Sequence, residues 1–168
     1  MRWSEFASAC PELADVARAR LEERHLCLVG TIRGDGWPRI TPVEPYFVGS
    51  ELMIGMMWRS RKAIDLLRDP RIVVHSTVTD WEATEGDIKL YGTVQDVREH
   101  DRRVALFRAI DAAHGWEQDP DEPDDDPEYH VFAVDVERAG YTRFGETTWV
   151  AWSWDEEQGL RTQERPKD

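Results

Sequence analysis

Residues 27–45 read CLVGTIRGDGWPRITPVEP and have the pattern of a β-hairpin. The first half, within residues 25–33, is rich in residues that favour strands. A Gly-Asp-Gly triplet at 34–36 supplies the positive-φ positions that a tight reversal requires. The return half, residues 37–48, contains three prolines, and each proline removes a donor from the hydrogen-bond ladder. We therefore expect this strand to be bent, bulged or at an edge, as backbone beside a ligand often is.

Further strands and a few helices follow this hairpin. The strands are joined mostly by short turns and do not alternate regularly with helices, which argues against a doubly wound parallel sheet. The pattern predicts a mainly β (α+β) fold, a small antiparallel barrel of six to seven strands with short flanking helices. The further strands are expected at 51–57, 71–78, 87–97, 129–136 and 147–154. Helices are expected within 1–24 from Pro11 onward, at 60–69 and at 99–113.

The composition limits the classes of function. With 168 residues and 40% hydrophobic residues, the chain can form one domain, 1–168, with a substantial core. Its formal net charge of −13 repels phosphate backbones and anionic lipids, so neither nucleic acid nor a membrane surface is an expected partner. The apolar runs are too short to cross a bilayer, and the first residues lack the features of a signal peptide. We expect a cytoplasmic protein.

Residues 117–128, EQDPDEPDDDPE, hold eight acidic residues and three prolines. A solvated acidic loop is expected here, because the prolines and the missing central glycine contradict an EF-hand calcium loop. The five histidines are scattered, and Cys10 and Cys27 lack the spacing of a zinc site, so no metal site is expected. Residues 155–168 are expected to form a C-terminal tail.

A cluster of cations begins the predicted helix at 60–69. Ser60 is a good N-cap residue, but Arg61 and Lys62 follow it in the first turn, and Arg59 precedes it. Cations at this end oppose the helix dipole. A bound phosphate would reverse the sign of the effect, because free N–H groups, the Ser60 hydroxyl and the cations would all favour an anion. The alternative is three exposed basic side chains without a ligand.

This segment carries a resemblance to a known family. Residues 60–63, SRKA, followed by a Leu pair at 66–67 and Asp-Pro-Arg at 69–71, resemble the SRKA…L…NPR segment of the pyridoxamine 5′-phosphate oxidase family and its flavin/deazaflavin oxidoreductase relatives. The hairpin at 27–45 and the strands at 52–57 and 88–97 match in the same order and spacing. The resemblance implies a split β-barrel homodimer that binds FMN at the subunit interface.

The resemblance also assigns cofactor-binding residues. Arg61 and Lys62 correspond to the pair that holds the cofactor phosphate, and Arg39 corresponds to the Arg that opens the second strand. The residues that would line the isoalloxazine ring are Ile40, Thr41 and Val43. We expect Met56 and Met57, with Trp58, to edge the ring pocket. The chain departs from the family pattern at Gly55-Met56, where Tyr-Thr is usual, and at Asp87, where a Gln reaches the flavin of the other subunit.

The expected function is an FMN-dependent oxidoreductase that acts on an unknown small molecule. Vitamin B6 oxidation is not expected, because the family's substrate-phosphate residues are not visible and the acidic loop repels a second phosphate. Two alternatives stay open: a reductase that uses the deazaflavin coenzyme F-420, and a non-enzymatic flavin- or haem-binding module. Trp152 and Trp154 share one strand face, for which core or dimer packing is favoured over a substrate-pocket wall.

Overall fold

The computed structural model describes residues 1–117 and 124–167. In these ranges nine strands form one antiparallel sheet with the order β2-β1-β5-β6-β7-β4-β3, to which β8 and β9 are added beside β7. The two end strands of this path, β2 and β3, do not pair with each other in the described chain, so the barrel stays open. The predicted antiparallel, mainly β fold is confirmed, but the described ranges contain nine strands where six to seven were expected. The strands are β1 (Cys27–Ile32), β2 (Pro38–Val43), β3 (Pro45–Val48), β4 (Glu51–Met57), β5 (Arg71–Ser76), β6 (Asp87–Asp96), β7 (Tyr129–Phe144), β8 (Thr148–Asp155) and β9 (Gly159–Pro166).

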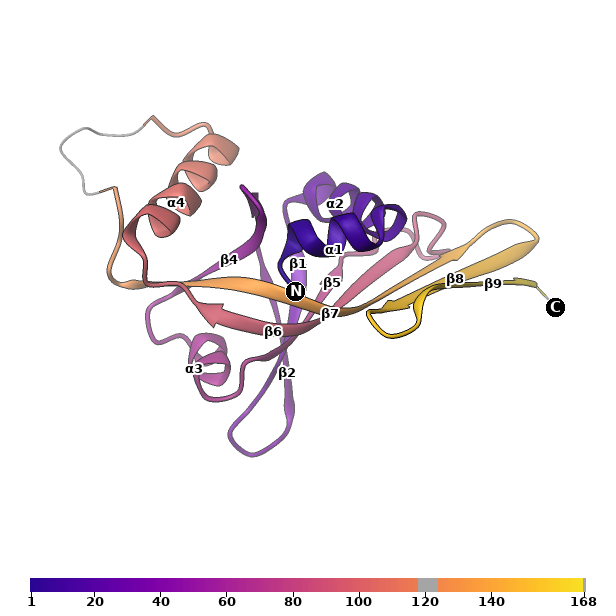
Figure 1. Ribbon diagram of the computed structural model, residues 1–168, viewed down its shortest axis with the longest axis horizontal. Coiled ribbons are helices and arrows are strands. Elements are labelled where there is room, and N and C mark those ends of the chain that lie inside the picture. The colour runs from indigo at the N-terminus through magenta and orange to yellow at the C-terminus, as the bar shows by residue number, and fades with distance from the viewer. Residues whose placement is uncertain (118–123, 168) are drawn as a thin grey trace.

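Four helices flank the sheet: α1 (Trp3–Ala9), α2 (Pro11–Arg24), α3 (Arg61–Arg68) and α4 (His100–His114). The sequence predicted a helix from Pro11, and the structure adds α1 before it. Cys10 separates the two helices with φ −146° and ψ 73°, because a residue before proline is driven out of the helical region. The helices α1 and α2 lie side by side over the sheet, while α4 lies at one end of the molecule (Figure 1).

The expected return strand at 37–48 is two strands in the structure. β2 pairs with β1, and β3 pairs with β4, so the halves belong to opposite ends of the sheet path. The break falls at Glu44, between Pro42 and Pro45, which cannot donate to a continuous ladder. The bend expected from the prolines is therefore a change from one edge of the sheet to the other.

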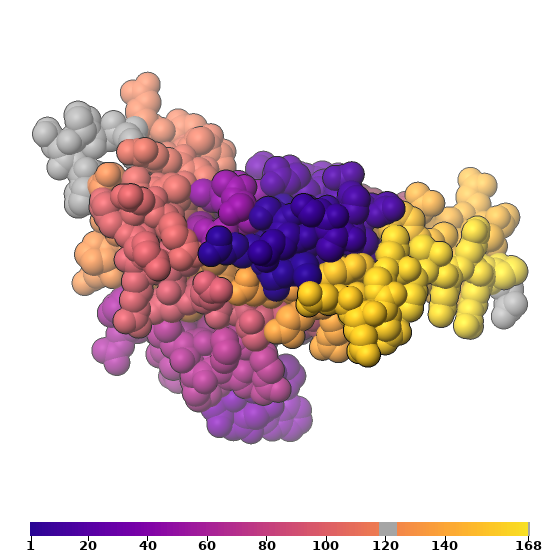
Figure 2. Space-filling view, viewed as in Figure 1, coloured from indigo at the N-terminus to yellow at the C-terminus, as the bar shows by residue number. Residues whose placement is uncertain are grey.

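β7 is twice as long as expected and links both halves of the molecule. It pairs with β6 along most of its length, with β4 near its start and with β8 near its end. Its register with β6 shifts at Gly92, where a side chain would overlap the carbonyl oxygen of Asp135. The expected C-terminal tail contains β9, which pairs with β8 at the end of the molecule opposite α4 (Figures 1 and 2). β9 was missed because its side chains are mostly exposed and show no apolar alternation.

The core has two parts. The larger part packs the inner face of the sheet against α1, α2 and α3, and Trp154 is buried in it, as the core interpretation of this residue predicted. The smaller part lies under α4 and includes Tyr46, Met53 and Val131. Of the expected acidic loop, residues 118–123 lie outside the described residues.

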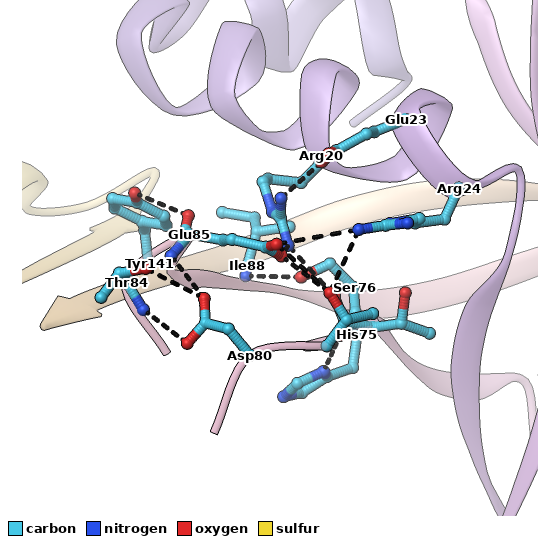
Figure 3. A network of polar contacts seen from close by, with 12 residues as sticks. Arg20, Glu23, Arg24, His75, Ser76, Asp80, Thr84, Glu85, Ile88 and Tyr141 are labelled. Atoms are coloured by element: carbon cyan, nitrogen blue, oxygen red, sulfur yellow. Dashed lines mark hydrogen bonds and ion pairs between the residues drawn. The ribbon is translucent and has the colours of Figure 1, made fainter. Parts of the chain in front are cut away.

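A network of polar contacts fixes the loop between β5 and β6 to α2 (Figure 3). Arg20 of α2 is buried, and its guanidinium contacts Glu85 at 2.7 Å and the carbonyl oxygen of Thr77 at 3.2 Å. Asp80 accepts hydrogen bonds from Thr84 within the same loop. The loop is thus held in one conformation beside the barrel. None of the helices in the described ranges has the length and apolar composition needed to cross a membrane.

Candidate functional site

The predicted anion site lies where β4 leads into α3. Ser60 stands at the N-cap, but its hydroxyl makes no capping bond. Ser60 Oγ is buried and has no hydrogen-bond partner among the described residues. The charged groups of Arg59, Arg61 and Lys62 form no ion pair within residues 1–117 and 124–167. The helix start therefore combines three uncompensated cations with N–H groups that no side chain caps, which favours an anion.

β2 supplies a second set of predicted residues. Arg39, Thr41 and Val43 alternate on the face directed toward the body of the molecule, where Thr41 Oγ1 is buried and, among the described residues, has no hydrogen-bond partner. Arg39 is half-buried and donates from Nε to Oδ2 of Asp65 on α3 at 2.7 Å. Ile40 points to the opposite face and is 71% exposed. Within one chain, Arg39, Thr41 and Val43 therefore share one face of β2, and Ile40 lies on the other face.

A cleft of about 280 Å³ adjoins the start of α3. Among the predicted residues, it is bordered by Val43, Met56, Met57 and Lys62. Met57 is 68% exposed, whereas the Met56 side chain is 1% exposed and belongs to the main core. Leu26, Pro42, Glu44, Tyr46, Gly55 and Tyr129 complete the lining. We call this the cofactor cleft.

Tyr129 is the lining residue that sequence reasoning missed most clearly. It lies on β7 opposite Met57, and its ring extends over Gly55. A Cβ at Gly55 would lie 3.0 Å from the Tyr129 hydroxyl oxygen and closer still to Cε1, so the tyrosine requires glycine at this position. The departure from the family pattern at Gly55 was a signal that another side chain fills this space. Its identity depended on the pairing of β4 with β7.

The cofactor cleft is lined by one acidic side chain, one basic side chain and two tyrosines. The Tyr46 hydroxyl donates to Oε2 of Glu44 at 2.6 Å, and this bond lowers the pKa of the Glu44 carboxyl below its usual range. Burial raises the pKa of the Tyr129 hydroxyl, and the nearby charge of Glu44 adds to the effect. At neutral pH the cleft therefore presents the Glu44 carboxylate, the Lys62 ammonium and a neutral tyrosine hydroxyl.

A second cleft of about 460 Å³ shares Tyr129 with the first. The Trp58 and His130 rings stack at its side with centroids 4.5 Å apart. Burial lowers the pKa of the His130 imidazole, so this ring is neutral at pH 7. The charged side chains of the lining are paired with carboxylates, Arg98 with Asp96 at 2.8 Å and Arg103 with Asp125 at 2.9 Å. We call this the aromatic cleft.

Asp87, the remaining departure from the family pattern, lies on another part of the sheet. It begins β6 and contacts Lys89 at 2.5 Å and His75 at 3.2 Å. It does not border either cleft. No group of three or more His, Cys, Asp or Glu residues in the described ranges is arranged to hold a metal ion.

Comparison with known families agrees with this geometry. The family model described as pyridoxamine 5′-phosphate oxidase matches residues 13–143. The chain belongs to this family. The match includes β2, β3, β4, α3 and the start of β7, which are the elements that line the cofactor cleft. A search of curated protein sequences gave no match to this chain.

Solved structures show the same fold. An FMN-binding protein related to pyridoxamine 5′-phosphate oxidase from Nostoc punctiforme superposes with a TM-score of 0.65 at 14% identity, covering 92% of this chain and 95% of that chain. A haem-binding protein from Mycobacterium smegmatis gives 0.62 at 12% identity, with coverage of 93% and 88%. PhzG from Burkholderia lata, in complex with tetrahydrophenazine-1-carboxylic acid, gives 0.63 at 12% identity, with coverage of 92% and 88%. At these identities the likeness shows a shared fold alone.

The residues present fit the phosphate end of a flavin. Thr41 Oγ1 and Ser60 Oγ are buried hydroxyls without a partner among the described residues, and such groups are rare unless a ligand or water satisfies them. Arg61 and Lys62 stand at the start of α3, where charge-assisted bonds to a phosphate are strongest. In this chain of the pyridoxamine 5′-phosphate oxidase family, the groups at the start of α3 thus fit a phosphate.

Proposed function

We propose that the protein is an FMN-dependent oxidoreductase that acts on a small organic molecule. The observation that carries this proposal is the buried Ser60 hydroxyl among the uncompensated cations at the start of α3, together with a second buried hydroxyl, Thr41 Oγ1 on β2, both without a partner among the described residues. Leaving two such groups unsatisfied is unfavourable, and a phosphate would accept a hydrogen bond from each. The family assignment supports a flavin as the molecule that carries this phosphate.

In this function the flavin supplies the redox chemistry, and the protein supplies binding and orientation. Arg61 and Lys62 hold the phosphate, with Arg39 beside them. Val43 and the exposed Met57 provide apolar contact for the ring system, and Tyr129 forms a wall with a free hydroxyl. Lys62 lies at the junction between the phosphate end and the cleft, so its ammonium compensates charge on the cofactor.

We also propose that a second copy of the chain covers the cofactor cleft. Several large apolar side chains near it are exposed, which is unusual for a surface that faces only water. The exposed set is Trp37, Ile40, Met57 and Trp58. A homodimer with the flavin at the interface would bury this surface, as family resemblance also implies.

The aromatic cleft supports a neutral, planar substrate. It shares Tyr129 with the cofactor cleft, so a molecule bound there would lie beside the flavin ring. Its arginines are paired with carboxylates, which leaves no compensating charge for a phosphorylated substrate. We expect pyridoxine phosphate to be a poor substrate and uncharged quinones or enones to be better ones. Stacking on Trp58 would favour a flat ring.

Two rival cofactors are separated by spectroscopy. The deazaflavin coenzyme F-420 carries a phosphate that could use the same cations. A haem is less well supported, since the lining of the cofactor cleft has no histidine or cysteine among the described residues. Flavin, deazaflavin and haem have distinct visible spectra, so the spectrum of the purified protein identifies the bound group.

The experiment that tests the proposed function is a titration of apo-protein with FMN and with riboflavin, which lacks the phosphate. We expect the unaltered protein to bind FMN much more tightly than riboflavin. The double variant Arg61→Ala/Lys62→Ala should lose most of this preference for FMN, because each charge-assisted bond contributes about 1.5–3 kcal/mol. Arg108→Ala, which removes an exposed arginine from α4, is the matched control. Equal binding of FMN and riboflavin by the unaltered protein would overturn the phosphate site.

Turnover is tested separately on the loaded protein. The oxidised bound flavin is mixed with pyridoxine phosphate without oxygen, and its bleaching shows whether this vitamer donates a hydride. Separately, the bound flavin is reduced without oxygen, and its reoxidation is followed after addition of oxygen or of a panel of quinones and enones. Saturable turnover of an uncharged acceptor supports the oxidoreductase. Fast turnover of pyridoxine phosphate would restore vitamin B6 oxidation, and no reoxidation by any acceptor would indicate a binding module.

A further inference from the structure

Asp65 is a buried carboxylate beneath the proposed phosphate site. Its side chain is 5% exposed, on the side of α3 that faces β1 and β2. Oδ2 accepts a hydrogen bond from Nε of Arg39 at 2.7 Å and another from the Thr31 hydroxyl at 3.1 Å. Oδ1 lies 3.5 Å from the guanidinium of Arg68. Three groups from three elements thus fix the position of this carboxylate.

The contact uses only part of the Arg39 guanidinium. Nε is bonded to Asp65, while the two Nη groups have no hydrogen-bond partner among the described residues. Asp65 follows Arg61 by four residues, which is about 6 Å along a helix axis. The Arg39 guanidinium is therefore bound about one helical turn from the start of α3, where Arg61 and Lys62 stand.

We propose that Asp65 is a positioning residue that holds the Arg39 guanidinium with its Nη groups directed at the flavin phosphate. The inference rests on the proposed function, in which that phosphate binds at the start of α3. An arginine side chain has many rotamers, and ordering it during binding reduces affinity. An arginine already fixed through Nε retains a planar pair of donors for an anion. Asp65 thus provides preorganisation without touching the cofactor.

The negative charge of Asp65, taken alone, predicts the opposite effect on FMN affinity. A carboxylate near a phosphate repels it, so a variant without this charge would bind FMN more tightly if Asp65 acted only through its field. A purely structural role predicts a third result, since general damage to the barrel would weaken FMN and riboflavin alike. The direction of the change and its dependence on the phosphate therefore distinguish the three roles.

The test compares apo-protein affinities for FMN and riboflavin in Asp65→Ala and in Asp65→Asn, which keeps the shape of the side chain. We expect Asp65→Ala to weaken FMN about tenfold or more, as for loss of a bond to a charged group, and to change riboflavin less than about twofold. Asp65→Asn should lie between, because its amide oxygen still accepts from Arg39. In an Arg39→Ala background, Asp65→Ala should have no further effect on the FMN preference.

The matched control is Asp69→Ala, which removes a carboxylate bonded to Arg71 at the other end of α3. It should leave the ratio of FMN to riboflavin affinity unchanged. Tighter FMN binding by both Asp65 variants, or an equal loss for FMN and riboflavin, would overturn the positioning role. The proposed function fails in a different way, namely if the unaltered protein itself does not prefer FMN.

Discussion

At the scale of single residues, the site is marked by groups that the apo-protein leaves unsatisfied. Ser60 Oγ and Thr41 Oγ1 are buried without a partner among the described residues, although Ser60 stands at a helix N-cap, where a serine readily bonds to the backbone. These hydroxyls form no hydrogen bond that would stabilise the folded apo-protein within the described residues. We therefore infer that they form their hydrogen bonds with a ligand. Gly55 is likewise explained by a contact with another group. The Tyr129 ring leaves no room for a Cβ at this position, whereas the backbone angles of Gly55 do not themselves require glycine.

The unsatisfied hydroxyls predict opposite changes in stability and binding. Thr41→Val and Ser60→Ala should leave the melting temperature of the apo-protein unchanged or raise it, because no hydrogen bond is lost on folding. Each should weaken FMN about two- to tenfold, the range for one neutral hydrogen bond. Thermal denaturation and FMN titration measure the two effects, with Thr93→Val on β6 as the control. A clear loss of apo-protein stability would contradict the assignment.

The contact between Gly55 and Tyr129 predicts a second effect. Gly55→Ala should lower the free energy of unfolding by about 1–3 kcal/mol, because the new methyl group forces the Tyr129 ring out of its place. Gly30→Ala is the control, since its added Cβ would meet Val73 at an ordinary 3.6 Å. Adding Tyr129→Ala should recover part of the Gly55→Ala loss in a chemical denaturation experiment. Additive losses would show that the two positions do not interact.

At the scale of elements, a buried arginine helps to hold α4 to the sheet, in addition to the smaller core beneath this helix. Arg103 bonds to Asp125 and to the carbonyl oxygens of Asp126 and Tyr129. Tyr129 begins β7 and lines both clefts, so this arginine also fixes the backbone next to the site. The helix therefore stabilises the cofactor cleft although its own residues do not line it.

This pairing predicts a pH dependence. The bond from Arg103 holds the pKa of the Asp125 carboxyl below its usual range, so Asp125 binds its proton more weakly in the folded state than in the unfolded state. Its stabilising contribution is complete above the ordinary aspartate pKa, about 4, and is lost as the pH falls through the lower folded-state value. Asp125→Asn should remove this part of the acid dependence of unfolding. Asp101→Asn, exposed on the same helix, should not.

At the scale of the whole molecule, the open barrel leaves its cofactor cleft beside exposed apolar side chains. We predict that Ile40→Asp weakens the proposed homodimer and lowers FMN affinity together, because a charge would be buried in the proposed interface. Light scattering at several protein concentrations measures the first effect, and FMN titration measures the second. Phe144→Asp at the far end of β7 is the control. A monomer that binds FMN with full affinity would contradict the shared site.

Short stretches of sequence are enough to predict the local features of this protein. The Gly-Asp-Gly turn, the prolines around Glu44 and the cations after Ser60 act within a few residues, so the hairpin, an irregularity in its return strand and the cationic start of a helix could be predicted. The packing of the whole chain sets which distant groups meet these features. Tyr129 reaches Gly55 through the pairing of β7 with β4, and Asp65 reaches Arg39 through the packing of α3 on the hairpin. β9 likewise forms by pairing with the edge of β8. Its own sequence has no apolar periodicity that would predict a strand. Such contacts depend on strand register and helix packing, which are properties of the whole chain and not of any short segment.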